Sequence, residues 1–275
     1  MTQGKEQPLR VMMIGAHPDD CEIGSGGLAT KYRRRGDIVK YVSATNGNAG
    51  HHEMGGETLA RRRFEETRRV AEIADIEYDV LDISDGELET DLGMRERFIR
   101  LIREFRPDLL FTHRTNDYHP DHRHTGILTQ DASYLIRVPN ICPQTPHLMH
   151  SPVILYMRDG FQKPNPFTPD VVVAIDDVLD TKVRMLHCHT SQMYEWLPYV
   201  GGYPAPEGGD DERFAWLSAR YARHAAVPDA GPIRDALIRR YGAERGGTIH
   251  SAEAFEVSEY GGPLEPDDVD RYFPL

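Results

Sequence analysis

The chain has 275 residues, of which 39% are hydrophobic and 28% are charged, and its formal net charge at pH 7 is −12. These values are typical of a soluble globular protein, and the acidic balance disfavours nonspecific binding to nucleic acid or to anionic lipid. No stretch approaches the roughly 18 apolar residues that a membrane-spanning helix needs, and the three cysteines lack the paired spacing of a disulfide framework or a cysteine zinc site.

In chain order, the polar segment Met1–Arg10 lacks the apolar core of a signal peptide, so we expect a cytoplasmic protein. Short apolar runs then alternate with helical patterns. The apolar runs predict strands over 9–15, 38–44, 78–83, 108–113, 153–157 and 171–175. The helical patterns predict helices over 27–35, 57–73, 92–105, 122–136 and 177–189. This alternation predicts an α/β fold, a Rossmann-like, doubly wound and mostly parallel sheet with strand order 3-2-1-4-5-6.

The character of the chain changes near Pro198, where glycine and proline become frequent. Two isolated helices are predicted beyond this point, over 212–224 and 233–241, and the last stretch is acidic and aromatic. We therefore predict a Rossmann-like core over 1–192. The remainder, 193–275, is expected to be a C-terminal extension that packs on the core as a cap or as a homo-oligomer contact.

Two short motifs rich in histidine and aspartate follow the first and fourth predicted strands. The first, Ala-His-Pro-Asp-Asp, occupies residues 16–20, and the second, His-Pro-Asp-His, occupies residues 119–122. Strands one and four are neighbours in a doubly wound sheet, and ligands bind at their carboxyl ends, where the strand order reverses. We therefore expect the two motifs to face each other across one crevice.

The residue types in this crevice suit a catalytic zinc ion, which takes three ligands from His and Asp or Glu and leaves a position for water. His17, Asp20 and His122 can supply those ligands. A helix start near His122 would keep its imidazole neutral, as a metal ligand must be. Zinc lowers the pKa of bound water from 15.7 to about 7. Iron, cobalt or nickel could occupy the same ligands, because affinity follows ligand type only loosely.

The remaining polar residues of the motifs supply groups for catalysis. Asp19, beside the proposed ligand, is placed to take a proton from the attacking water. His119 is placed opposite, to stabilise or protonate what forms in the transition state, and Asp121 could hold the His119 ring in one tautomer. Together these groups suffice for hydrolysis of an amide.

The sequence also predicts roles for the other histidines and leaves two other functions open. We expect His113 to be a structural group under the loop, His124 to be a surface or supporting residue, and His51 and His52 to lie in a solvated loop. The turn after the first strand lacks Gly-x-Gly-x-x-Gly and carries two carboxylates, so a nicotinamide or flavin cofactor is not expected. A phosphoesterase on the same metal and a non-catalytic sugar- or metal-binding protein stay open as alternatives.

At these motifs the sequence resembles the PIG-L/LmbE-like family of zinc-dependent N-deacetylases. Residues 16–20 look like the family's Ala-His-Pro-Asp-Asp signature, although Cys21 stands before Glu22, where the signature usually continues with Glu. Residues 119–122 look like its His-Pro-Asp-His signature. A weaker likeness extends over about residues 10–192, through the Thr-Asn-Gly loop and the Arg of the next helix.

The resemblance implies a role for each motif residue. His17, Asp20 and His122 would be the zinc ligands, Asp19 the general base, and His119 the electrostatic stabiliser or acid.

It also implies that Asp121 orients His119 and that Arg63 contacts the substrate. Family members deacetylate N-acetylglucosamine in several conjugates. The resemblance therefore implies zinc-dependent hydrolysis of an N-acyl (N-acetyl) amide on a small amino sugar or its conjugate, which releases acetate and a free amine.

Overall fold

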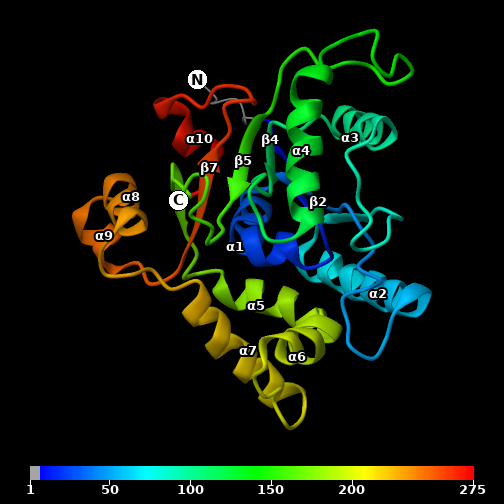
Figure 1. The fold of residues 1–275 in the computed structure, drawn as a ribbon. Helices are drawn as coiled ribbons and strands as arrows, with labels where there is room; N and C mark the ends of the chain where they lie inside the picture. The colour runs from blue at the N-terminus through cyan, green and yellow to red at the C-terminus, as the bar shows by residue number, and fades with distance from the viewer. Residues whose placement is uncertain (1–6) are drawn as a thin grey trace.

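The computed structural model describes residues 7–275. Residues 1–6, which form part of the segment expected to carry no signal peptide, lie outside the described residues. A seven-stranded sheet in the order β3-β2-β1-β4-β5-β7-β6 forms the centre of the molecule (Figure 1). The strands are β1 (Arg10–Gly15), β2 (Ile38–Ser43), β3 (Glu77–Val80), β4 (Leu109–Thr112), β5 (Val153–Met157), β6 (Val171–Ala174) and β7 (Ala252–Val257).

Strand β1 lies at the point where the direction of winding reverses. It pairs in parallel with β2 on one side and with β4 on the other. Its residues are almost all buried, as expected for a central parallel strand that is covered on both faces. The carboxyl ends of β1 and β4 therefore lie side by side at one edge of the sheet, which confirms the predicted doubly wound α/β fold.

The predicted strand order is wrong at one end of the sheet. Strand β7, from the C-terminal extension, inserts between β5 and β6 and runs antiparallel to both. Its sequence, AEAFEV, carries a buried glutamate, Glu253, at a position where an apolar residue would mark a core strand. The extension 193–275 thus does more than pack on the core, because it supplies one strand of the central sheet.

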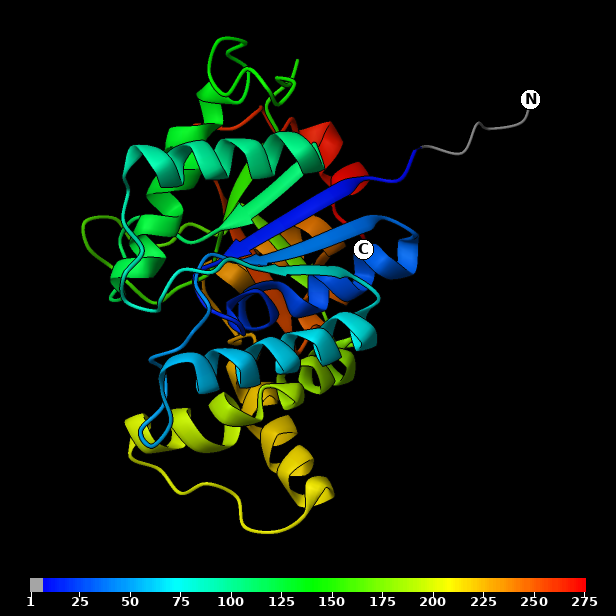
Figure 2. The same cartoon turned by 90° about the vertical axis from the view of Figure 1, so that its right-hand side faces the viewer.

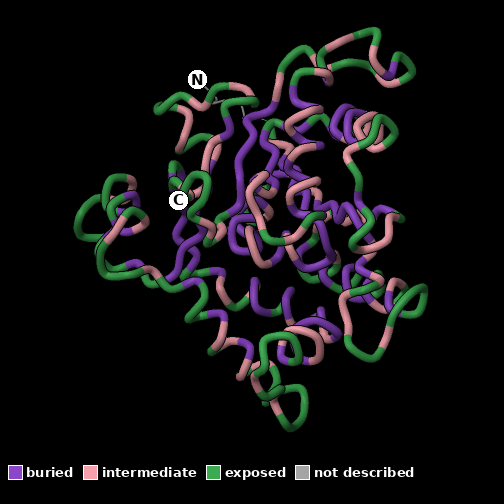
Figure 3. Tube along the Cα trace, viewed as in Figure 1, coloured by how far each residue is buried: buried purple, intermediate pink, exposed green. Residues whose placement is uncertain are grey.

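Helices cover both faces of the sheet (Figure 2). On one face, Val11 and Met13 of β1 pack in a hydrophobic cluster with Leu28 of the first helix, α1. On the other face, Met12 and Ile14 belong to a cluster with residues of α3 and α4. The buried residues therefore concentrate in the sheet and the helix faces turned toward it (Figure 3). The helices of the core are α1 (Asp20–Arg35), α2 (Gly56–Ala74), α3 (Leu92–Phe105), α4 (Pro120–Leu135) and α5 (Leu179–Cys188).

The segment after α5 continues in a π-helical turn and further helices; in Figure 1 those over 197–224 lie below the sheet, those over 232–248 lie to its left, and the last one lies near the top. None of the helices formed by residues 7–275 is long and apolar enough to cross a membrane. The helical elements after α5 are η1 (Ser191–Trp196), α6 (Leu197–Gly201), α7 (Asp210–His224), α8 (Pro232–Tyr241), α9 (Ala243–Thr248), η2 (Pro266–Asp268) and α10 (Val269–Tyr272).

Two helices begin earlier than their sequence patterns predict. Helix α1 starts at Asp20, not near residue 27, because the glycines of its first turns hide the helical pattern. Helix α4 starts at Pro120, a residue that favours the first position of a helix. Both motifs therefore sit at helix N-termini, where Asp19 and His119 are the N-cap residues.

A buried ion pair joins three elements of the fold. The Lys182 ammonium of α5 donates to Glu253 Oε1 of β7 at 2.6 Å and to the Ile23 carbonyl of α1 at 2.7 Å. The Glu253 carboxylate also accepts the backbone N–H groups of Gly27 and Leu28 in α1. Because α1 begins at the first motif, this pair fixes the helix that carries the site.

Replacing Lys182 with methionine should destabilise the protein by about 3–5 kcal/mol, because the Glu253 carboxylate would stay buried without its counter-ion. Urea unfolding of the purified variants measures this change. The matched control is Arg184→Met on the same helix, where both members of the Arg184–Asp180 pair are more than half exposed. That control should stay within about 0.5 kcal/mol of the unmodified protein. Equal effects of the two substitutions would contradict the assignment.

Candidate metal centre and active site

Three side chains from the two motifs converge at the carboxyl ends of β1 and β4. Nδ1 of His17 lies 3.2 Å from Nε2 of His122. Oδ2 of Asp20 lies 3.5 Å from each of these two nitrogens. All three side chains are about nine-tenths buried. The structure therefore brings together the three residues that the sequence assigns to a metal.

The spacing of these three atoms fits a zinc ion. Tetrahedral ligands at 2.0–2.1 Å from zinc are separated from one another by about 3.3–3.4 Å. The measured separations of 3.2, 3.5 and 3.5 Å match this value. The ligand set is also chemically suitable, because it combines two imidazoles and one carboxylate, which zinc prefers.

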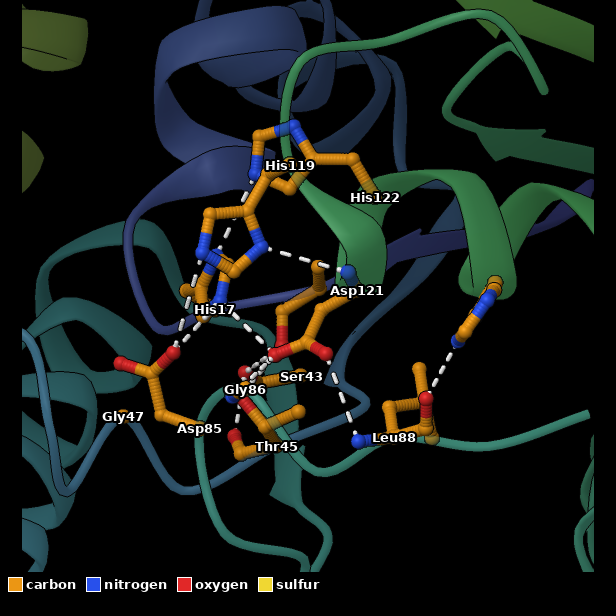
Figure 4. A network of polar contacts seen from close by, with 12 residues as sticks. His17, Ser43, Thr45, Gly47, Asp85, Gly86, Leu88, His119, Asp121 and His122 are labelled. Carbon is orange, nitrogen blue, oxygen red and sulfur yellow. Dashed lines mark hydrogen bonds and ion pairs between the residues drawn. The ribbon is translucent and has the colours of Figure 1, made fainter.

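Carboxylates behind His17 fix which of its nitrogens faces this centre. Nε2 of His17 lies 3.1 Å from Asp85 Oδ1 and 3.3 Å from Asp121 Oδ2, as Figure 4 shows. Asp121 is held in turn by the backbone N–H of Gly86 at 2.7 Å. These contacts favour a proton on Nε2, so the Nδ1 lone pair points to the centre. Burial lowers the pKa of His17, but its hydrogen bonds to carboxylates outweigh this and raise it well above the usual value.

A carboxylate also fixes which nitrogen of His122 faces the centre. Its Nδ1 lies 3.1 Å from Asp117 Oδ1, which leaves Nε2 facing the centre. The ring of His113 stacks on His122 with 4.1 Å between centroids, and its Nε2 lies 3.2 Å from Asp20 Oδ2. His113 therefore lies under the loop, as expected, but it also contacts a proposed ligand directly.

Asp85 and Asp117 were not singled out in the sequence. Each combines with histidines into a further group that could hold an ion: His17, Asp85, His119 and Asp121 form one, and His113, Asp117 and His122 form another. Both groups share a histidine with the first one. Among residues 7–275 these sets therefore describe one centre with alternative ligands, not separate sites. The sequence signal that could have found them is weak, because it consists only of an aspartate in each of the polar loops that follow β3 and β4.

Asp19 occupies a strained backbone position beside this centre. Its φ of 126° lies in a region that non-glycine residues rarely adopt, at a cost of about 1–3 kcal/mol. The side chain is buried, and its Oδ1 lies 3.5 Å from Nη2 of Arg63. Burial raises the pKa of Asp19 to about 6, although the Arg63 guanidinium opposes the shift. The carboxylate is thus held at the centre with an affinity for protons that suits a base near neutral pH.

The hydrogen bonds of His119 differ from those that the sequence predicts. Its Nδ1 accepts the backbone N–H of Asp121 at 3.2 Å and so caps α4. The Asp121 carboxylate points instead to His17. A backbone amide, not the Asp121 side chain, therefore sets the tautomer of His119, and Nε2 carries the proton. Burial and the nearby His17 and His122 lower the pKa of His119, which favours the neutral ring.

Arg63 lies behind Asp19 and is almost fully buried, with 2% of its surface exposed. Its guanidinium donates to the backbone carbonyls of Pro18 and Gly47. Gly47 has a φ of 66°, and a Cβ at this position would lie 2.4 Å from the guanidinium. Only glycine therefore lets the loop after β2 fold over Arg63. These contacts give Arg63 a positioning role, while its contact with substrate stays a prediction.

A cavity of about 440 Å³ opens over the centre. His17, Asp19 and His119 line its floor, and Arg63 also reaches it. One wall of the cavity comes from the C-terminal extension, through Trp196, Leu197 and Val200 of η1 and α6. A volume in the range of about 300–1,000 Å³ is typical of sites for small ligands.

The other histidines have mixed outcomes. His124 hydrogen-bonds through Nδ1 to the Leu88 carbonyl, which makes it a supporting residue, as expected. His52 is exposed in its loop, also as expected. The expectation for His51 is wrong: its side chain is 3% exposed, and its Nε2 lies 2.8 Å from Glu195 Oε2.

Comparison with known proteins gives consistent matches. Residues 12–133 match the family described as PIG-L: GlcNAc-PI de-N-acetylase. A diacetylchitobiose deacetylase of Thermococcus kodakarensis is 35% identical over 208 residues, which cover 70% of this chain and 74% of the relative.

Solved structures show the same fold. An N,N'-diacetylchitobiose deacetylase from Pyrococcus horikoshii aligns with a TM-score of 0.66 at 24% identity, covering 91% of this chain and 84% of that one. A 4-carboxy-2-hydroxymuconate hydratase from Pseudomonas putida aligns with a TM-score of 0.71 at 20% identity, covering 93% and 98%. The fold alone therefore does not decide the reaction. The two motifs, the matched region and the 35% identical relative together show that this chain belongs to the PIG-L family.

Proposed function

We propose that this protein is a zinc-dependent N-deacetylase that hydrolyses the N-acetyl amide of an N-acetylglucosamine unit in a small saccharide or conjugate. The observation that carries the proposal is the convergence of His17, Asp20 and His122 beside the carboxylate of Asp19. The diacetylchitobiose deacetylase of Thermococcus kodakarensis supports the substrate class. The products would be acetate and a free amine.

The proposed metal ligands are His17 Nδ1, His122 Nε2 and Asp20 Oδ2, because their separations suit tetrahedral coordination. When bound there, zinc supplies a Lewis acid and makes water more acidic. Asp85 and Asp117 lie 3.1 Å from the outer nitrogens of His17 and His122 and are placed to keep the two rings in the required orientation.

Asp19 is the proposed general base. Its carboxylate lies at the floor of the cavity and is fixed by Arg63 and by the turn before α1. It would take a proton from the attacking water, and the amide carbon would then become tetrahedral. The amine leaves with the proton that Asp19 took from the water, because the neutral His119 ring could not give up its Nε2 proton without becoming an imidazolate.

His119 is the proposed stabiliser of the tetrahedral oxyanion. Because its Nδ1 accepts a backbone N–H, its Nε2–H is available at the cavity. A neutral imidazole can donate this hydrogen bond without a second positive charge beside the metal. A preorganised donor of this kind contributes about 3–4 kcal/mol to transition-state stabilisation.

The geometry favours this reaction over a two-metal phosphoesterase. Two-metal sites hold their ions about 3.5–4 Å apart, each with its own ligands. In the described residues 7–275, the candidate ligand groups share His17 or His122, so filling one group depletes another. A protein that only bound sugar or metal would have no use for the strained base Asp19.

The direct test is a fluorescamine assay for released amine on N-acetylglucosamine and N,N'-diacetylchitobiose. We expect release by the purified protein, loss of release after treatment with a chelator, and recovery when zinc is added back. A phosphate ester tested in parallel should stay intact. Turnover of the ester without amine release would contradict the proposed function.

Two substitutions distinguish the role of the general base from that of a metal ligand. Asp19→Asn should lower turnover at least about 10²-fold while metal content is unchanged, because the amide cannot accept the proton. His122→Ala should lose both metal and turnover. His147→Ala, which changes an exposed histidine outside the cavity, is the control and should keep both. Elemental analysis by mass spectrometry gives the metal content; an active Asp19→Asn variant would rule out the base role.

The carboxylate behind His17 should tune metal affinity. Asp85→Asn is expected to weaken zinc binding about tenfold, at the low end of the range for such residues, since Asp121 still accepts from the same nitrogen. Asp82→Asn, exposed on the same loop, should leave affinity unchanged. Competition with a chromophoric chelator measures both. Equal affinities in the two variants would show that Asp85 does not support the ligand.

A further inference from the structure

Four aromatic rings form a continuous stack from the loop after β2 to the cavity. His51 stacks on His52 with 4.7 Å between ring centroids and 16° between planes. His52 stacks on Tyr199 at 4.1 Å and 8°, and Tyr199 lies 5.9 Å from Trp196 at 25°. We call these four residues the ring stack. It joins two segments that are far apart in the sequence.

The ring stack ends at the proposed active site. Trp196 lines the same cavity as His17, Asp19 and His119 and is half-buried. Tyr199, one step outward, is 61% exposed. The stack therefore leads from the reacting centre to the surface, and its outer part carries large apolar area in contact with solvent. Exposed aromatic surface next to a polar site is characteristic of ligand binding.

An ion-pair network holds the ring stack in place. Glu195, the residue before Trp196, binds Arg62 of α2 through both carboxylate oxygens and His51 through one of them. His51 Nδ1 in turn accepts the backbone N–H groups of Glu53 and Met54. The network fixes η1 against both the loop and α2. A platform fixed in this way binds with little loss of conformational entropy.

We infer that Trp196, backed by Tyr199, forms a sugar-binding platform that stacks on the saccharide ring next to the reacting N-acetylglucosamine. This inference rests on the proposed function and names its substrate more closely: an oligosaccharide of at least two rings, not a monosaccharide. Tyr199 stacks against Trp196, and Trp196 itself lines the cavity. The second sugar would lie along this wall.

The chemistry of a pyranose suits such a platform. The C–H groups on one face of the ring are apolar and slightly positive, while the face of an indole is negative and apolar. Stacking removes both faces from water, and the hydroxyl groups at the edge of the sugar stay solvated. The platform thus recognises a ring without hydrogen bonds to it. Trp196 is here a specificity-determining residue, not a catalytic residue.

Kinetics on matched substrates test the assignment. Trp196→Ala should lower kcat/KM for N,N'-diacetylchitobiose about tenfold more than for N-acetylglucosamine, a difference of about 1.4 kcal/mol. The loss should be mainly in KM, with metal content unchanged. Trp196→Phe keeps a flat ring and should recover most of the loss. Trp216→Phe, in α7 and outside the cavity, is the control and should match the unmodified protein.

Fluorescence gives a readout that does not depend on turnover. The chain has two tryptophans. In a Trp216→Phe, Asp19→Asn variant the emission therefore comes from Trp196 alone. Titration with N,N'-diacetylchitobiose should give a saturable change at a concentration at least about tenfold lower than N-acetylglucosamine requires. A variant that keeps Trp216 and carries Trp196→Phe should show no such change.

The outcomes separate this inference from the proposed function. Deacetylation of both sugars by the unmodified protein, with equal or no loss in Trp196→Ala, would overturn the platform and leave the function standing. If neither sugar releases amine, the proposed function is overturned. The fluorescence titration then tests the platform separately, and equal binding of the disaccharide and the monosaccharide would overturn the platform as well.

Discussion

The structure depends on three side chains whose possible metal-binding atoms face one another at the carboxyl ends of β1 and β4. Nδ1 of His17 and Nε2 of His122 lie 3.2 Å apart, and both lone pairs are directed inward by carboxylates on the outer nitrogens. Two such lone pairs repel unless a cation lies between them, and the Asp20 carboxylate completes a negative pocket for it. A divalent ion satisfies all three groups at once. The surrounding aspartates, the strained turn and the helix caps can be understood as means of holding this arrangement.

The fold holds the cluster through its strand ends and helix starts. The motifs follow neighbouring strands, β1 and β4, so residues far apart in sequence meet at one edge of the sheet. A helix begins within each motif. The Lys182–Glu253 ion pair joins the first of these helices, α1, to strand β7. The C-terminal extension contributes a strand to this frame and a wall to the cavity.

Most of the fold and the three proposed metal ligands could be predicted from the sequence. The spacing of hydrophobic residues and the order of the predicted strands suffice to place the carboxyl ends of the parallel strands. His17, Asp20 and His122 were found together for that reason. Strand β7 was missed because the buried Glu253 breaks its apolar pattern, and its role depends on Lys182 from a distant helix. Asp85 and Asp117 were missed because a supporting carboxylate is defined by which nitrogen it faces, which only the tertiary structure reveals. No motif in the sequence around Trp196 indicates that this residue lines the cavity.

Anomalous diffraction at the zinc absorption edge, from crystals grown with the metal, tests the central claim most directly. The account predicts one peak within about 2.0–2.2 Å of His17 Nδ1, Asp20 Oδ2 and His122 Nε2. An ion on the other nitrogen of His17, between Asp85 and Asp121, would contradict it, and so would the absence of any peak among these side chains at saturating zinc.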